Sequence, residues 1–286
     1  MRLGEILDGS FNIYRRHFGL FMRLSLILVW LPTAAGIYLN LRFSGSPFEL
    51  LSMFEQNIGM SIGIFVLFIV VWSACSLLLK AGTIRVISDS YLGHEPELGA
   101  SLRFGTARII PLLLVTLSKN LLLVLIMFFG ALVVILLGAS SKLIGGIGAL
   151  FAFGAGCALF WFLPYIATAY GVTTPVVVLE DLSSSFDAFG RSWDLTRGAR
   201  GKLFATVAVT LLISQFLPGM VVSGMSAAVG LTAGSNWQPF FAVLGSLLGI
   251  VLAPILPCAL TLAYYDLRVR REAFDIQILS EQLGAR

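Results

Sequence analysis

The sequence is poor in charged residues: Asp, Glu, Lys and Arg make up only 12% of its 286 positions. A soluble globular domain carries about 25%. Hydrophobic residues reach 58%, and the mean hydropathy is +0.93. This balance excludes a soluble fold and predicts an all-α, multi-pass membrane protein.

Histidine and cysteine are also scarce, with two and three copies respectively. The cysteines lie inside apolar runs without C-x-x-C spacing, which is typical of small buried side chains rather than of disulfides or zinc ligands. Around His94 the residues do not match H-E-x-x-H, and Pro96 prevents His94 and Glu97 from sharing a regular helical face. We therefore expect no metal site and no cofactor. The cysteines are Cys75, Cys157 and Cys258.

Six apolar runs are each long enough to cross a hydrocarbon core, which takes about 20 helical residues. All six should be helices, because lipid offers no partners for backbone polar groups. The first run lacks an A-x-A cleavage site, so we expect it to stay in the mature protein. Residues 1–286 are predicted to form a single membrane domain. The runs cover residues 20–41, 58–79, 112–139, 145–171, 203–230 and 240–265.

Most of the nineteen basic residues fall on one side of these spans. The loops of the opposite side hold only Arg42 and Lys142. The positive-inside rule then predicts that both termini are cytoplasmic, in the inner membrane of a prokaryotic cell. The net charge of +4 reflects this bias rather than nucleic-acid binding. The cytoplasmic set is Arg2, Arg15, Arg16, Lys80, Arg85, Arg103, Arg108, Arg191, Arg197, Arg200, Lys202, Arg268, Arg270, Arg271 and Arg286.

A weak internal repeat combines an amphipathic stretch with two spans, over residues 1–92, 93–181 and 182–280. The amphipathic stretches are GEILDGSFNIYRRHFGLF, PELGASLRFGTARII and SSSFDAFGRSWDLTRGARGKLF. Ser184 and Asp187 in the third have capping-box-like spacing. Each returning span begins with small residues four apart, which predicts close helix packing and approximate three-fold symmetry. These residues are Gly59 and Gly63; Gly148, Ala152 and Gly156; and Gly245, Gly249 and Ala253.

The closing stretch LAYYDLRVRREAFD, residues 262–275, predicts a membrane exit. Tyr264 and Tyr265 would lie at headgroup depth as aromatic belt residues, and Asp266 would mark the boundary. The alternative is a specific site formed by Asp266 with Arg268 or Arg271.

Three segments at the ends of spans resemble a known family. LGEILDGSFNIYRRHFGLF, FGRSWDLTRGARGKLF and YYDLRVRREAFD are similar to the membrane domain of some prokaryotic glycerophosphoryl diester phosphodiesterases and of its stand-alone six-helix relatives. In the fused proteins, catalysis belongs to a separate soluble barrel domain. No part of this sequence resembles that barrel, so the resemblance implies a membrane role without the activity.

Polar residues inside the runs are few, and Lys119 is the sharpest case. An ionisable residue inside a span is costly in lipid, so it is a candidate functional residue. The run from Ile109 to Ala139 exceeds a core of about 30 Å, so Lys119 can lie near the cytoplasmic interface with its ammonium reaching water. The alternative is an inward-facing Lys119 beside Asn120. Gln215 is the third intramembrane polar candidate.

The pattern favours a non-enzymatic membrane scaffold or accessory protein, with a basic cytoplasmic collar that contacts anionic lipid or a protein partner. A transporter or channel for a small solute or lipid is the alternative. An intramembrane enzyme ranks third, because no nucleophile and base or metal-ligand set lies at membrane depth. Candidate contact residues are Arg15, Arg16, Arg103, Arg108, Trp193, Arg197, Arg200, Lys202, Asp266, Arg268 and Arg271.

Overall fold

The computed structural model describes residues 3–43, 58–91, 93–233 and 237–272. Every regular element in these residues is a helix, as the composition predicts. Six of the helical segments are long and apolar enough to cross a membrane: Phe18–Tyr38, Val66–Tyr91, Ile109–Ser140, Gly146–Leu179, Arg200–Thr232 and Gln238–Glu272. The first predicted outer loop and the end of the closing stretch, residues 44–57 and 273–286, lie outside the described residues.

The chain forms two compact units, and it passes between them within three of its helices. The first unit contains Met1–Ile109 and Thr206–Leu262, and the second contains Ile110–Ala205 and Ala263–Arg286.

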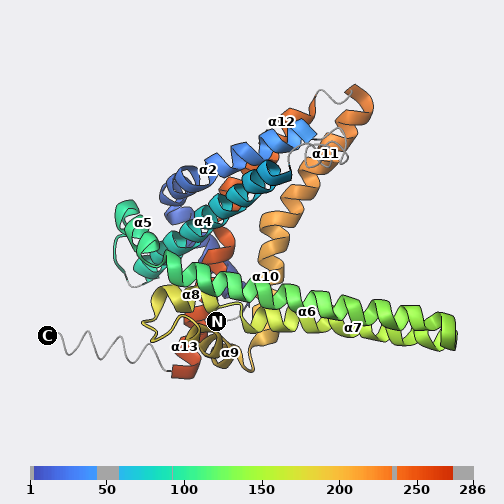
Figure 1. The fold of residues 1–286 in the computed structure, drawn as a ribbon. Helices are drawn as coiled ribbons and strands as arrows, with labels where there is room; N and C mark the ends of the chain where they lie inside the picture. Colours follow the sequence, from blue (N-terminus) through green and yellow to red (C-terminus); the bar gives the residue numbers. More distant parts are fainter. Residues whose placement is uncertain (1–2, 44–57, 92, 234–236, 273–286) are drawn as a thin grey trace. The chain divides into compact units, whose positions relative to one another are not determined.

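The first unit is built on α1 (Leu3–Arg16), α2 (Phe18–Phe43), α4 (Ile58–Tyr91) and α5 (Leu98–Ala107). Helix α4 packs between α2 and α5, and α12 (Gln238–Leu252) packs against α2 and α11 (Leu217–Ala233). Figure 1 shows α2 and α4 side by side. The close approach falls at Gly82 of α4, where an added Cβ would lie 3.0 Å from the Leu24 side chain.

The sixth span is interrupted between α12 and α13 (Ile255–Glu272). Pro254 lies at the break, where it cannot supply a helical N–H. The end of α12 leaves carbonyl oxygens without helical donors. Tyr14 of α1 satisfies one of them, because its hydroxyl donates to the carbonyl oxygen of Val251 at 2.6 Å.

The second unit contains α6 (Ile109–Ile144), α7 (Gly146–Ala169), α8 (Thr173–Leu179), α9 (Asp187–Thr196) and the start of α10 (Arg200–Leu211). Helices α6 and α7 run side by side (Figure 1). They turn at Gly145, whose φ of +66° suits glycine. An added Cβ at Gly130 would lie 2.5 Å from the Leu159 side chain, so the two helices approach closely there.

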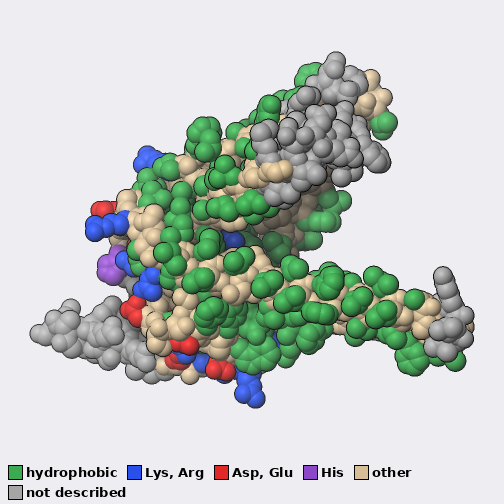
Figure 2. All heavy atoms as spheres, viewed as in Figure 1, with side chains coloured by type: hydrophobic (Ala, Val, Ile, Leu, Met, Phe, Trp, Pro, Cys, Tyr) green, Lys and Arg blue, Asp and Glu red, His purple; other side chains and the backbone are tan. Residues whose placement is uncertain are grey.

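Hydrophobic side chains cover the visible face of the α6–α7 pair (Figure 2). In the most apolar stretch of α6, no residue is buried. In the most apolar stretch of the span that contains α7, 6% of the residues are buried. This exposed apolar surface suits lipid contact, because a soluble protein rarely leaves so large an apolar area uncovered.

The second and sixth spans extend well beyond the residues that their hydropathy predicts. The second was expected to end at residue 79, but α4 continues to Tyr91, so Lys80 and Arg85 lie in a helix and not in a loop. The extension is held by buried apolar residues such as Ile84 and Ile87, while Arg85 pairs with Asp89 one turn later at 3.1 Å. The sixth span likewise continues to Glu272.

The prediction for Tyr264 and Tyr265 was wrong. Both are buried, with 0% and 3% of their surface exposed, so they are core residues and not an interfacial belt. The small-residue faces pack closely at some positions only: Gly148 is buried, and an added Cβ at Gly245 would lie 3.4 Å from the Val222 side chain. Among the described residues, an added Cβ would meet nothing within 4 Å at Gly59, Gly63, Gly156 and Gly249.

Short helices form at all three amphipathic stretches: α1, α5 and α9. The capping box predicted from Ser184 and Asp187 forms only in part. The Asp187 carboxylate accepts a hydrogen bond from the Ser184 backbone N–H at 2.9 Å, but the Ser184 hydroxyl accepts from the Phe186 N–H at 3.3 Å, and α9 begins only at Asp187. The superposition of the three repeats stays a prediction.

Candidate functional site

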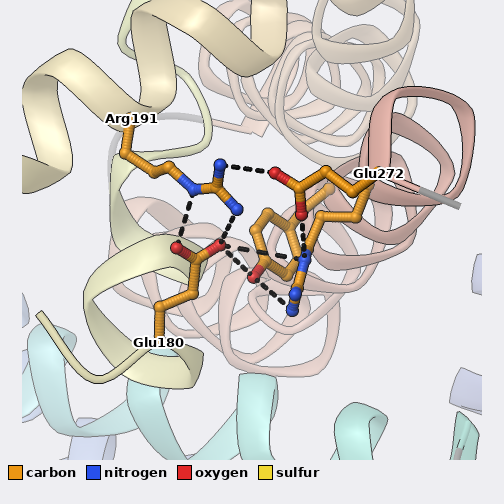
Figure 3. A network of polar contacts seen from close by, with 5 residues as sticks. Glu180, Arg191 and Glu272 are labelled. Carbon is orange, nitrogen blue, oxygen red and sulfur yellow. Dashed lines mark hydrogen bonds and ion pairs between the residues drawn. The ribbon is translucent and has the colours of Figure 1, made fainter. Parts of the chain in front are cut away.

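A ring of charged and polar side chains joins α8, α9 and α13 in the second unit (Figure 3). Glu180, at the end of α8, accepts hydrogen bonds from Arg191 Nε at 2.8 Å and from the Tyr264 hydroxyl at 2.7 Å. Arg191 also pairs with Glu272. Arg268 closes the ring, donating to Glu272 at 3.0 Å and to the Tyr264 hydroxyl at 3.3 Å.

The ring balances two arginines with two glutamates in a partly buried setting. The Glu180 side chain is 12% exposed and that of Arg191 is 32% exposed. Burial disfavours the charge of Arg191, but hydrogen bonds and attraction from Glu180 and Glu272 outweigh it and raise the pKa of the guanidinium. The ring therefore tethers α9 to the end of α13. It contains no unbalanced charge to recruit a ligand.

A second cluster centres on Asp266, whose side chain is 6% exposed. Lys202 at the start of α10 donates to it at 2.6 Å, and Arg270 donates at 3.1 Å. The ion pairs of Asp266 thus differ from the predicted alternative with Arg268 or Arg271. Arg271 instead donates to the backbone carbonyl oxygen of Arg197.

These contacts separate the predicted collar residues of the second unit into two groups. Lys202, Asp266 and Arg268 bond to other protein groups and hold the fold together. Arg197 and Arg200 instead line a pocket on the surface.

Arg200 is held between two aromatic rings. Its guanidinium carbon lies 3.8 Å from the ring centre of Trp193 and 4.6 Å from that of Tyr165, and Nη1 donates to the Tyr165 hydroxyl. Its Nε–H is buried and has no hydrogen-bond partner within the described residues. Two cation–π contacts fix the plane of this guanidinium.

Two adjoining pockets share Tyr165, Arg200 and Gly201 as lining residues. One pocket, of about 590 Å³, is completed by Trp193, Arg197 and Gly198. The other, of about 500 Å³, is lined mainly by apolar side chains of α7 together with Phe204 of α10. We call the two pockets together the α7–α10 groove. A groove that is cationic at one end and apolar along the other suits an amphiphilic anion.

The predicted collar residues of the first unit are more dispersed. Arg15 and Arg16 are exposed in the last turn of α1, and Arg103 is exposed on α5. Arg108 follows α5 and is half-buried. Three of these four side chains, those of Arg15, Arg16 and Arg103, are therefore exposed.

The intramembrane polar candidates line neither pocket of the groove. Lys119 is half-buried, whereas Asn120 and Gln215 are exposed. Gln215 lies in a π-helical turn, Leu212–Phe216, that interrupts the fifth span. Within the described residues, no group of three or more His, Cys, Asp and Glu side chains is placed to hold a metal ion.

Sequence reasoning nominated Arg197, Arg200 and Trp193 of the groove and Arg268 of the ring, but missed their other members. Tyr165 resembled an ordinary aromatic residue of a span. Glu180 followed an apolar run, and its partner Glu272 is far away in the sequence, so no local spacing links them.

The comparisons with known proteins give no relative on which to draw. A scan against family models, a search of curated proteins and a search of solved structures each found no match.

Proposed function

We propose that this chain is a non-enzymatic scaffold or accessory protein of a prokaryotic inner membrane. Its basic side, facing the cytoplasm, contacts the headgroups of anionic lipids, and a membrane or cytoplasmic protein partner docks there. The observation that carries the proposal is the placement of exposed arginines, on α1, on α5 and before α10, in segments that lead into apolar spans. Each cation near an anionic surface contributes about 1 kcal/mol.

The resemblance of three segments to the phosphodiesterase membrane domain supports the same role. In those fused proteins catalysis resides in the soluble barrel, so a likeness limited to the membrane part favours a non-enzymatic function.

The experiment compares the lipids that surround the protein with those of the bulk membrane. The protein is extracted directly into polymer nanodiscs, and its lipids are quantified. We expect anionic phospholipids to be enriched, and the triple variant of Arg15, Arg16 and Arg103 to Gln to lose much of this enrichment in a salt-sensitive manner.

The matched control neutralises the opposite side, with Arg42→Gln and Lys142→Gln. This double variant should retain the wild-type enrichment. A wild-type lipid shell identical to the bulk membrane would refute the proposal.

The alternative, a transporter or channel for a small solute or lipid, draws on one feature of the fifth span. The π turn Leu212–Phe216 is followed by Pro218, and the Ser214 hydroxyl in the turn is buried without a partner within the described residues. Interrupted helices often form transport sites. Faster movement of a labelled phospholipid between leaflets of proteoliposomes than of empty vesicles would favour this alternative.

A further inference from the structure

The α7–α10 groove has two chemically distinct ends in a fixed order along the fifth span. Arg197 and Gly198 precede α10, Arg200 and Gly201 begin it, and Phe204 follows one turn later. The cationic end therefore lies at the start of the span, and the apolar end extends along it.

The apolar end follows one face of α7. Ala158, Trp161, Tyr165 and Thr168 are spaced three or four residues apart and line the same pocket. Trp161 is 70% exposed, so this wall is open to whatever covers α7. A hydrocarbon chain lying along the span would cover it, at a gain of about 0.8 kcal/mol per buried methylene.

The cationic end is prepared for a phosphate. Arg200 is held by ring contacts with Trp193 and Tyr165, and it lines the pocket. Arg197 is exposed, and the turn that carries it is held by the hydrogen bond from Arg271 to its carbonyl oxygen. A guanidinium offers several donors in a fixed plane, which matches phosphate oxygens. The start of α10 adds a positive helix-dipole end.

The groove also discriminates against zwitterionic headgroups. Among the described residues that line the groove, none is a carboxylate that would pair with a choline or ethanolamine cation. Aromatic faces can bind quaternary ammonium ions. In the groove, however, the faces of Trp193 and Tyr165 toward Arg200 are already occupied by its guanidinium.

We infer that the α7–α10 groove binds one anionic phospholipid, with its phosphate on Arg200 and Arg197 and an acyl chain between α7 and Phe204. This inference rests on the proposed function, because it assigns a specific site within the contact between the protein and anionic lipid. The collar arginines of the first unit attract many lipids through a screened field, whereas the groove holds a single molecule.

The test is native mass spectrometry of the full chain with phosphatidylglycerol and phosphatidylcholine of equal chain length. The wild type should retain one phosphatidylglycerol at collision energies that remove other lipids. Arg200→Gln should weaken that binding by about tenfold or more, since it removes charge-assisted hydrogen bonds. Lys142→Gln, in a predicted loop of the opposite side, should leave it unchanged.

Two further measurements keep the inference open to refutation if Arg200→Gln does not fold. Phe204→Ala, at a 44% exposed position, should weaken binding severalfold while preserving the preference for the anionic lipid. Soluble glycerol phosphate should not displace the bound lipid from the wild type. Displacement would show a site for free phosphate esters and overturn the inference.

The outcomes separate the two claims. Enrichment of anionic lipid in nanodiscs without a single retained phosphatidylglycerol would refute the groove and leave the proposed function standing. Absence of both would refute both. Equal retention of phosphatidylcholine would also overturn the inference.

Discussion

Replacing Glu180 by Gln should loosen the attachment of α9 to α13. The amide keeps the shape of the side chain but removes its charge, and its NH₂ group faces donors of Arg191. Arg191 and Arg268 would then share only Glu272 within the ring. Hydrogen bonds to charged groups contribute about 1.5–3 kcal/mol each. Because Arg191 is 32% exposed, we expect a total loss within that range and not the larger cost of a fully buried pair.

The assay is hydrogen exchange of α9 (Asp187–Thr196), measured by mass spectrometry on the protein in nanodiscs. A loss of about 1.5–3 kcal/mol corresponds to roughly 10- to 140-fold faster exchange. Arg85→Gln is the control, because its ion pair with Asp89 is an i,i+4 pair within one helix and its arginine side chain is 39% exposed; exchange in α4 should change by no more than about threefold. An effect of Glu180→Gln in α9 no larger than this control would refute the ring as a tether.

Two smaller predictions concern a turn and a histidine. Gly145→Ala should destabilise the α6–α7 turn by about 1–2 kcal/mol, because φ is +66°, whereas Gly146→Ala should be neutral or slightly stabilising; a Tm in detergent that falls equally for both would contradict this. Burial and then the charge of Arg16 lower the pKa of His17 below its ordinary value of 6.5. Its neutral form therefore favours folding above pH 6.5, and this contribution is lost as the pH falls through its folded-state pKa. An NMR titration, with His94→Gln for assignment, should give a midpoint below 6.5, and one at or above 6.5 would contradict it.

The spans could be predicted from the sequence because lipid imposes a strong, local requirement for long apolar runs. Their ends could not, because a charge does not end a helix when the protein itself supplies a partner. Arg85 lies opposite Asp89 one turn away, and α4 therefore continues past it. A hydropathy profile takes account only of the charge of Arg85, so it predicts an end of the span that is too early.

The candidate site, like the spans, could be predicted only in part. Arg197 and Arg200 could be nominated from local sequence, since basic residues before a span are a recognised signal. Local sequence could not show that Lys202 differs from these two arginines, because the difference depends on Asp266, which lies far away in the sequence. The prediction for Tyr264 and Tyr265 failed for a related reason. A tyrosine at the end of a span can place its hydroxyl among lipid headgroups or donate it to a buried carboxylate. The hydroxyl of Tyr264 donates to Glu180.

The central claim is that the basic side of the protein faces the cytoplasm, where anionic headgroups and a partner would meet it. Cysteine labelling in intact cells tests this directly, in a background without native cysteines. Thr106→Cys reports the basic side, because this residue is exposed at the end of α5, and Ser46→Cys reports the predicted outer loop. We predict that a membrane-impermeant maleimide labels Ser46→Cys in intact cells and labels Thr106→Cys only after the cells are opened. Labelling of Thr106→Cys in intact cells, with protection of Ser46→Cys, would contradict the account.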